Sequence, residues 1–203
     1  MSDVTAITIG RARPAHPSGV VAATAVPDLG GLREAAARAG TRLLWLLDAA
    51  AVPLPATLPP LLEHAGSPAV SMPVDAGGAP VEGAIGRIDD HDPGALLERV
   101  ADRCAPLRHT PVVSMLVERR LVEAAAPPDT RRFGPYAGAE WTARLFSDRP
   151  GLLVPASRVE LAAPLPRSAL GALRMARGGA WRRGEAVREA QRALAWRATG
   201  AAR

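Results

Sequence analysis

Apolar residues along the chain gather in short runs separated by turn-forming residues, a pattern that predicts strands alternating with helices. Residues 3–10 (DVTAITIG) alternate polar with β-branched side chains and end at a glycine, which predicts a strand. Residues 18–26 predict a second strand, and residues 32–40 (LREAAARAG) predict a short helix ended by Gly40. Residues 42–48 (RLLWLLD) are apolar on both faces, as expected inside a mostly parallel sheet covered by helices. This order of elements is typical of an α/β layer.

The chain continues this alternation up to residue 165. Further strands are predicted at 68–74, 110–120 and 151–161, and further helices at 55–66, 95–104 and 139–148. Residues 75–94 are rich in Gly, Pro and Asp and predict a loop. With 203 residues, 48% of them hydrophobic, the chain is long enough to bury a core. We expect one α/β domain over residues 1–165, with residues 43–47 in a central strand buried on both sides.

The composition changes near residue 166, where Arg and Ala become dominant. Residues 167–203 hold nine Arg against Glu185 and Glu189, a net charge of +7, which leaves −2 for residues 1–166 because the whole chain carries +5. The basic charge therefore belongs to a predicted helical tail over 166–203, and the body gives no indication of nucleic-acid binding. Trp181 and Trp196 are expected to be available at a lipid interface, so the tail predicts binding to an anionic membrane surface or an acidic protein.

Cysteine usage and the N-terminus bear on the compartment. Cys104 is the only cysteine, so an internal disulfide is impossible and a reducing cytoplasm fits best. Cys104 follows an apolar helical pattern and is expected to be buried. Residues 1–19 lack the basic start and apolar core of a secretory signal, and no apolar run is long enough to cross a bilayer. We therefore expect a cytoplasmic protein, with the tail as its means of peripheral attachment to the membrane.

Three segments carry a family resemblance, namely residues 43–65 (LLWLLDAAAVPLPATLPPLLEHA), 108–146 (RHTPVVSMLVERRLVEAAAPPDTRRFGPYAGAEWTARLF) and 151–159 (GLLVPASRV). In their order and spacing, over roughly residues 30–160, they resemble family-two glycosyltransferases with the GT-A fold. The likeness is strongest to the actinobacterial branch of galactofuranosyl- and rhamnosyltransferase-like proteins. It implies a nucleotide-sugar or glycan ligand, and a donor site containing Asp48.

The acidic metal-binding run of that family is incomplete here. In the family, the strand that matches residues 43–47 ends in a D-x-D cluster, which holds a divalent cation against the diphosphate of the sugar nucleotide. This chain has Asp48, Ala49 and Ala50, so Ala50 stands where a metal ligand is expected. Metal is therefore not expected, and Mn²⁺ or Mg²⁺ is implied only if the protein is active. Apart from the resemblance, Asp48 is also well placed to cap the turn that follows it.

The catalytic base of the family is missing as well. The family signature is an acidic pair followed by a helix of the form E-[Y/W]-T-x-R-L. The helix is matched by Glu140, Trp141, Thr142, Arg144 and Leu145. At the positions of the acidic pair stand Ala137 and Gly138, which cannot accept a proton. Glu140 remains as a candidate displaced base, although an acid in the first turn of a helix is also favoured by the helix dipole.

The loop 127–138 (PPDTRRFGPYAG) borders the acceptor site in the resemblance. Arg131 and Arg132 are implied to contact the donor diphosphate, while Phe133, Tyr136 and Trp141 are implied to contact the acceptor. The alternative is an ordinary surface loop with one aromatic anchor. The family also places a helix between its first two strands, whereas residues 11–18 are too short and proline-rich for one, so the fold is expected to be abridged there. Asp89–Asp92 (DDHD) is expected to be a solvated loop rather than a metal site.

These observations leave three hypotheses. The first is a catalytically impaired glycosyltransferase-like protein, acting as the partner of an active glycosyltransferase or as a binding module in the biosynthesis of a glycan or glycosylated metabolite. The second is an active, metal-independent transferase using Asp48, Glu140 and the arginines at 131 and 132. The third is a membrane-surface adaptor that acts through the basic tail. The fold alone does not choose among them.

Overall fold

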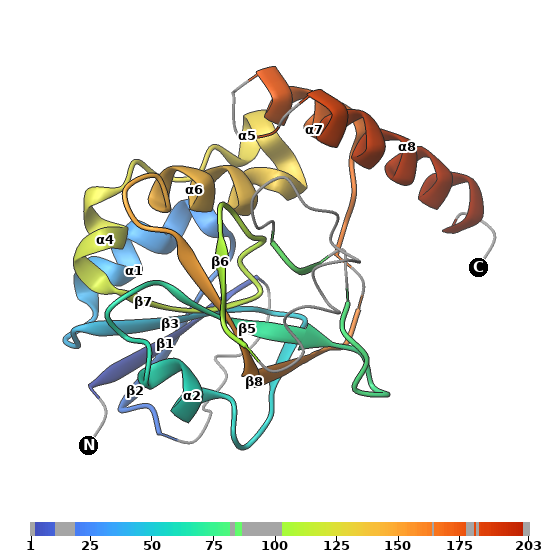
Figure 1. The fold of residues 1–203 in the computed structure, drawn as a ribbon. Coiled ribbons are helices and arrows are strands. Elements are labelled where there is room, and N and C mark those ends of the chain that lie inside the picture. The colour runs from blue at the N-terminus through green and yellow to red at the C-terminus, as the bar shows by residue number, and fades with distance from the viewer. Residues whose placement is uncertain are drawn as a thin grey trace.

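The computed structural model describes residues 3–10, 19–81, 84–86, 103–163, 165–177, 181 and 183–200. Within these residues one eight-stranded sheet, ordered β2-β1-β3-β7-β5-β8-β4 with β6 also paired to β8, is flanked by helices (Figure 1). The strands are β1 (Val4–Ile9), β2 (Ala22–Val26), β3 (Leu43–Asp48), β4 (Ala51–Pro53), β5 (Ala69–Val74), β6 (Ala105–Leu107), β7 (Ser114–Glu118) and β8 (Gly151–Leu161). The helices are η1 (Leu29–Gly31), α1 (Leu32–Arg38), α2 (Leu58–Leu62), α4 (Arg119–Ala124), α5 (Thr130–Phe133), η3 (Gly134–Tyr136), α6 (Ala137–Leu145), α7 (Ala169–Arg177) and α8 (Arg183–Gly200).

The direction of the strands confirms a mixed α/β fold with a mostly parallel sheet. The strands β1, β2, β3, β5 and β8 run in the same direction, whereas β4, β6 and β7 run against them. Strand β7 lies antiparallel between β3 and β5, in the middle of the sheet. The sequence did not indicate this insertion.

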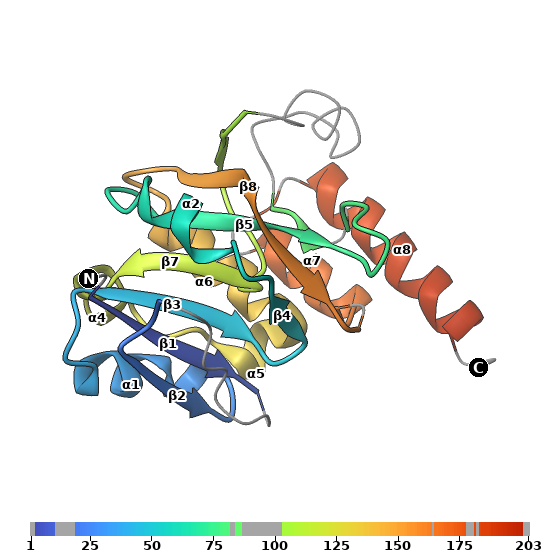
Figure 2. The ribbon, with the colours of Figure 1, turned by 90° about the horizontal axis from the view of Figure 1, so that it is seen from below.

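Strand β3 is buried on both faces, as predicted. Leu44 and Leu46 pack in the cluster that includes residues of α1, α4 and α6. The alternate residues Leu43, Trp45 and Leu47 pack in the cluster that includes Leu58 and Leu61 of α2. Because successive side chains of a strand point to opposite faces, β3 joins the two layers of helices. Figure 2 shows α2 on the near face of the sheet, opposite α1 and α6.

Several predicted boundaries differ from the structure. The strand predicted at 110–120 is β7, which ends at Glu118, and the chain then turns directly into α4. The helix predicted at 55–66 is reduced to α2 over Leu58–Leu62. Residues 87–102 lie outside the described residues. They include Asp89–Asp92 and most of the predicted helix 95–104. Residues 11–18, on which the abridged N-terminus was predicted, also lie outside them.

The two C-terminal helices pack on the body rather than extending from it freely. Ala172 and Met175 of α7 and Trp181 share a buried cluster with Phe133 and Tyr136. Trp181 is only 8% exposed and packs edge-on against the ring of Tyr136, so the prediction that it is available to lipid is wrong. The side chain of Trp196 is outside the described residues. The domain boundary near residue 165 stays a prediction.

Cys104 is exposed, which corrects the expectation that it is buried. The expectation assumed that the thiol packs beside a helix, whereas Cys104 is not in a helix. Cys104 directly precedes β6, and its Sγ lies 3.4 Å from Nε2 of His64.

None of the helices in the described part of the chain has the length and apolar character needed to cross a bilayer. A peripheral association through the tail stays a prediction, as does the cytoplasmic location.

Candidate functional site

A cavity of about 370 Å³ opens where β1 and β3 end at their carboxyl termini. Gly10 follows β1, Asp48 ends β3 and Asp28 follows β2, and all three line the cavity. The remaining lining residues are Ile9, Leu29, Pro111, Val112, Val113, Thr130, Gly134, Pro135, Gly138, Leu165 and Pro166. Open α/β sheets bind ligands at the carboxyl ends of their parallel strands, so this is the place where the fold itself predicts a site.

The lining of this cavity is largely apolar. Among its described residues, Asp28 and Asp48 carry the ionisable side chains. The Asp28 carboxylate accepts a hydrogen bond of 2.7 Å from the backbone N–H of Gly30, at the start of η1. An apolar surface with a few polar groups is typical of small-ligand sites, which use polar contacts to fix the orientation of the ligand.

Asp48 caps the turn that follows β3, as its position in the sequence had suggested. Its Oδ1 accepts a hydrogen bond of 2.8 Å from the backbone N–H of Ala50. Burial raises the pKa of the Asp48 carboxyl above its ordinary value, because the charged form is poorly solvated, while the hydrogen bond from Ala50 lowers it. Asp48 is thus both a structural group and a half-buried acid at the cavity.

Gly138 brings the second signature of the resemblance to the same cavity. It lies in the first turn of α6 and lines the cavity together with Asp48, although 90 residues separate the two along the chain. A Cβ atom at Gly138 would lie 3.2 Å from the backbone nitrogen of Val112 and 3.4 Å from Cδ1 of Leu29. The cavity wall therefore leaves little room for a side chain at position 138. Ala137 is fully buried among the helices.

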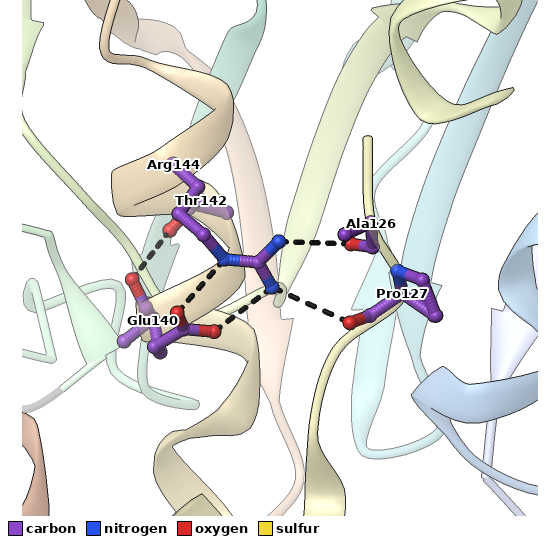
Figure 3. Close-up of polar contacts among 6 residues, drawn as sticks. Ala126, Pro127, Glu140, Thr142 and Arg144 are labelled. Carbon is purple, nitrogen blue, oxygen red and sulfur yellow. Dashed lines mark hydrogen bonds and ion pairs between the residues drawn. The ribbon is translucent and has the colours of Figure 1, made fainter. Parts of the chain in front are cut away.

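Glu140 does not line the cavity. It is held in an ion pair with Arg144 (Figure 3). Its two carboxylate oxygens accept hydrogen bonds of 2.8 and 3.0 Å from the Arg144 guanidinium. The same guanidinium donates to the backbone carbonyls of Ala126, at 3.0 Å, and Pro127, at 3.4 Å. Glu140 and Arg144 therefore tie α6 to the segment before α5, an arrangement that supports a structural role. The catalytic role of Glu140 stays a prediction.

Arg131 and Arg132 lie on α5, exposed, and neither lines the cavity. The Arg132 guanidinium lies 5.1 Å from the centroid of the Phe133 ring, and its backbone N–H donates to the Asp129 carboxylate at 2.9 Å. Thr130, on the same helix, does line the cavity. Contact of the two arginines with a diphosphate stays a prediction.

The three aromatic residues implied for the acceptor are buried in the protein. Trp141 is 1% exposed in the core under α6, and Phe133 and Tyr136 are 4% and 8% exposed beneath α7. The Tyr136 hydroxyl donates to Oε1 of Glu189 at 3.0 Å and accepts from the backbone N–H of Ser168 at 3.2 Å. None of the three lines the cavity, because protein groups already cover their rings. Acceptor binding by these residues stays a prediction.

Tyr136 gives a direct measure of this packing. Burial, aided by the charge of Glu189, raises its pKa from 10.0 to about 12, although Ser168 and Arg167 oppose the shift. The folded state keeps this proton to a higher pH than the unfolded state does. The contribution of Tyr136 to the free energy of unfolding should therefore be fully present below pH 10 and be lost between pH 10 and about 12. Tyr136 is the only tyrosine, so an absorbance titration of its phenolate reports this group alone.

Two variants accompany this titration. We expect Glu189→Gln to lower the midpoint and Tyr136→Phe to remove the fall in stability over that range. A midpoint at the ordinary value in the intact protein would show that the ring is not buried in solution.

Sequence reasoning missed Asp28, Leu29, Val112 and Leu165 as lining residues. Asp28 could have been found, since it follows a predicted strand at the same edge of the sheet as Asp48. The others carry no chemical signal in the sequence. Within the described residues, no three His, Cys, Asp or Glu side chains gather closely enough to hold a metal ion.

Comparison with known proteins identifies no family. No protein-family model matches the chain, and no curated protein matches it. Among solved structures, the chain is similar to the crystal structure of GalNAc-T7 with UDP, GalNAc and Mn²⁺, with a TM-score of 0.48 and 17% sequence identity. The match covers 72% of this chain and 33% of that one, so the chain spans about a third of the length of the structure it matches.

Proposed function

We propose that this chain is a GT-A-like, glycosyltransferase-related protein that binds a nucleotide sugar or glycan in its cavity and transfers no sugar. In this role it serves as the partner of an active glycosyltransferase or as a binding module in the biosynthesis of glycans or glycosylated metabolites. The observation that carries the proposal is the joint presence of Asp48 and Gly138 in one cavity at the carboxyl ends of β1 and β3. In the family resemblance, Asp48 belongs to the acidic run that binds the metal, and Gly138 stands at a position of the acidic pair that supplies the catalytic base.

The chemistry of the described lining supports binding more than transfer. Activation of an acceptor hydroxyl requires a proton acceptor within hydrogen-bond reach, and Gly138 has no side chain. Glu140, the nearest acid along α6, is already paired with Arg144. A hard divalent cation requires several oxygen ligands held together, whereas Asp48 already uses Oδ1 to cap the turn at Ala50.

One observation favours the active, metal-independent alternative. Asp48 combines a raised pKa with a place at the cavity, and such groups are frequent in catalytic sites. In this alternative Asp48, Glu140 and the arginines at 131 and 132 act in place of the metal to stabilise the diphosphate.

Calorimetry of the intact protein tests the proposal, with a uridine and a thymidine diphosphate sugar, each with and without Mn²⁺. We expect one nucleotide sugar, or the corresponding glycan, to bind with an affinity that Mn²⁺ does not change. Mn²⁺ alone should show no site tighter than about millimolar, because the ligands are too few. No nucleoside diphosphate should be released on prolonged incubation.

Two variants locate the binding. Gly138→Val should abolish it, since a side chain there enters the cavity wall, while Asp148→Asn, at an exposed position outside the lining, should leave it unchanged. Release of nucleoside diphosphate that disappears in Asp48→Asn would establish the active alternative and reject the first proposal. Failure of every nucleotide sugar and glycan to bind would reject both.

A further inference from the structure

The two C-terminal helices expose large apolar side chains to solvent. Leu170 and Leu173 on α7 are 57% and 47% exposed, and Val187 and Leu194 on α8 are 50% and 57% exposed. In the described part of the chain only three other large apolar side chains are comparably exposed, at Val21, Val52 and Leu54. Exposed apolar surface is thus concentrated on α7 and α8.

The spacing on α7 places these side chains on one face. Leu170, Leu173 and Arg177 are related by three and seven positions, so they lie along the same side of the helix. The opposite side carries Gly171, Ala172 and Met175, which are buried against the body. Helix α7 therefore packs its glycine, alanine and methionine on the body and exposes its leucine and arginine side chains to solvent.

The charges of these helices are sorted in the same way. Glu189 is turned inward, where its carboxylate accepts from Tyr136 and pairs with Arg167 at 3.2 Å. Arg177, Arg188 and Arg192 are exposed. Among the described side chains of α7 and α8, the acid therefore lies inside and these three arginines lie outside. In Figures 1 and 2, α8 projects beyond the sheet, so a flat surface can approach it.

We propose that the outer surface of α7 and α8 docks on an anionic lipid bilayer. Leu170 and Leu173 enter the boundary between headgroups and acyl chains, while Arg177 and Arg188 pair with lipid phosphates. Leucine beside arginine on an exposed face is the composition of helices that lie in the membrane interface, and the charge complements anionic headgroups. This surface is separate from the cavity, and the inference does not rest on the proposed function.

Sedimentation of the full-length protein with vesicles tests this inference. The vesicles contain either phosphatidylcholine alone or equal parts of phosphatidylcholine and phosphatidylglycerol. We expect sedimentation with the anionic vesicles at low ionic strength, a steep decrease with added salt, and none with phosphatidylcholine alone. The double variant Arg177→Gln with Arg188→Gln should lower the partition coefficient about 25-fold, because each arginine near an anionic surface contributes a factor of about five. Leu170→Ser with Leu173→Ser should lower it by about tenfold or more.

Matched variants on the body separate this surface from a general effect of charge. Arg33→Gln with Arg38→Gln removes two exposed arginines from α1, and Val21→Ser with Val52→Ser removes two exposed apolar side chains. Both should bind like the parent, and circular dichroism should show that all variants are folded. The inference is overturned if the anionic vesicles do not sediment the protein, or if the body variants lose as much binding as the helix variants. It is also overturned if the leucine variants bind like the parent, because this outcome indicates adsorption by charge alone, as to an acidic protein.

Discussion

Replacing Trp45 by alanine is expected to lower the free energy of unfolding by about 3–5 kcal/mol, because a large fully buried side chain is lost from the centre of the sheet. Trp45 is 1% exposed and packs against α2. Its indole N–H donates to Oγ of Ser114 at 3.0 Å, which joins β3 to β7. Urea denaturation followed by circular dichroism measures the change.

The indole N–H belongs to a buried chain of hydroxyl groups. Ser114 Oγ lies 2.7 Å from Ser71 Oγ, which lies 2.8 Å from Ser157 Oγ, and Ser157 donates to the carbonyl of Thr57 at 2.7 Å. This chain of hydroxyl groups therefore crosses from β3 through β7 and β5 to β8 and ends beside α2.

Trp45→Phe is the control, since it keeps an aromatic ring and removes the donor. Ser114 retains Ser71 as a partner, so the cost should be only about 1–2 kcal/mol. Equal losses for Trp45→Ala and Trp45→Phe would show that the hydrogen bond, rather than the packing, dominates. A loss below about 1 kcal/mol for Trp45→Ala would contradict the burial of β3.

Gly171→Val is expected to weaken the attachment of the C-terminal helices, with a loss of about 1–3 kcal/mol from overpacking. A Cβ atom at Gly171 would lie 2.8 Å from the Tyr136 ring and 3.1 Å from the carbonyl oxygen of Phe133. Because a backbone carbonyl cannot easily move, α7 must shift outward. Limited proteolysis with trypsin, which cleaves after the arginines of α7 and α8, should become faster in this variant.

Gly184→Ala is the matched control on α8. Gly184 is exposed, and a new Cβ there would lie 3.8 Å from a side-chain nitrogen of Arg188. This change should stabilise the helix by about 0.5 kcal/mol or less, since alanine favours helix over glycine but position 184 lies in the first turn of α8. If Gly171→Val resists trypsin as well as Gly184→Ala does, the packing of α7 on Tyr136 does not occur in solution.

The strands that could be predicted from the sequence are those whose own residues reveal their burial. Residues 43–47 are apolar at every position, and this pattern suffices to identify a strand covered on both faces. Strands β4 and β6 escaped prediction because each has three residues and contains a proline, Pro53 or Pro106, which removes a backbone donor. Their strand conformation depends on pairing with β8, a contact that no local pattern contains.

The location of a candidate residue could be predicted where it follows from the residue's place at the end of a strand. Asp48 is such a residue, and it lies at the cavity and caps its turn. The surroundings of Phe133 and Tyr136 could not be predicted, because α7 covers them and the sequence does not show where α7 packs. The pairing of Glu140 with Arg144 is different, since a spacing of four positions on a helix brings opposite charges together and could have indicated an ion pair.

The insertion of β7 between β3 and β5 has a consequence for how the chain is made. During synthesis β1, β2 and β3 emerge first, and one edge of β3 has no partner until residues 114–118 have left the ribosome. The contact between Trp45 and Ser114 closes a loop of 69 residues, and such distant contacts form slowly. An unpaired strand edge formed by the apolar residues 43–47 is a site for association with other chains. The interval before β7 arrives is therefore the period when this edge of the nascent sheet is most exposed to association with other chains.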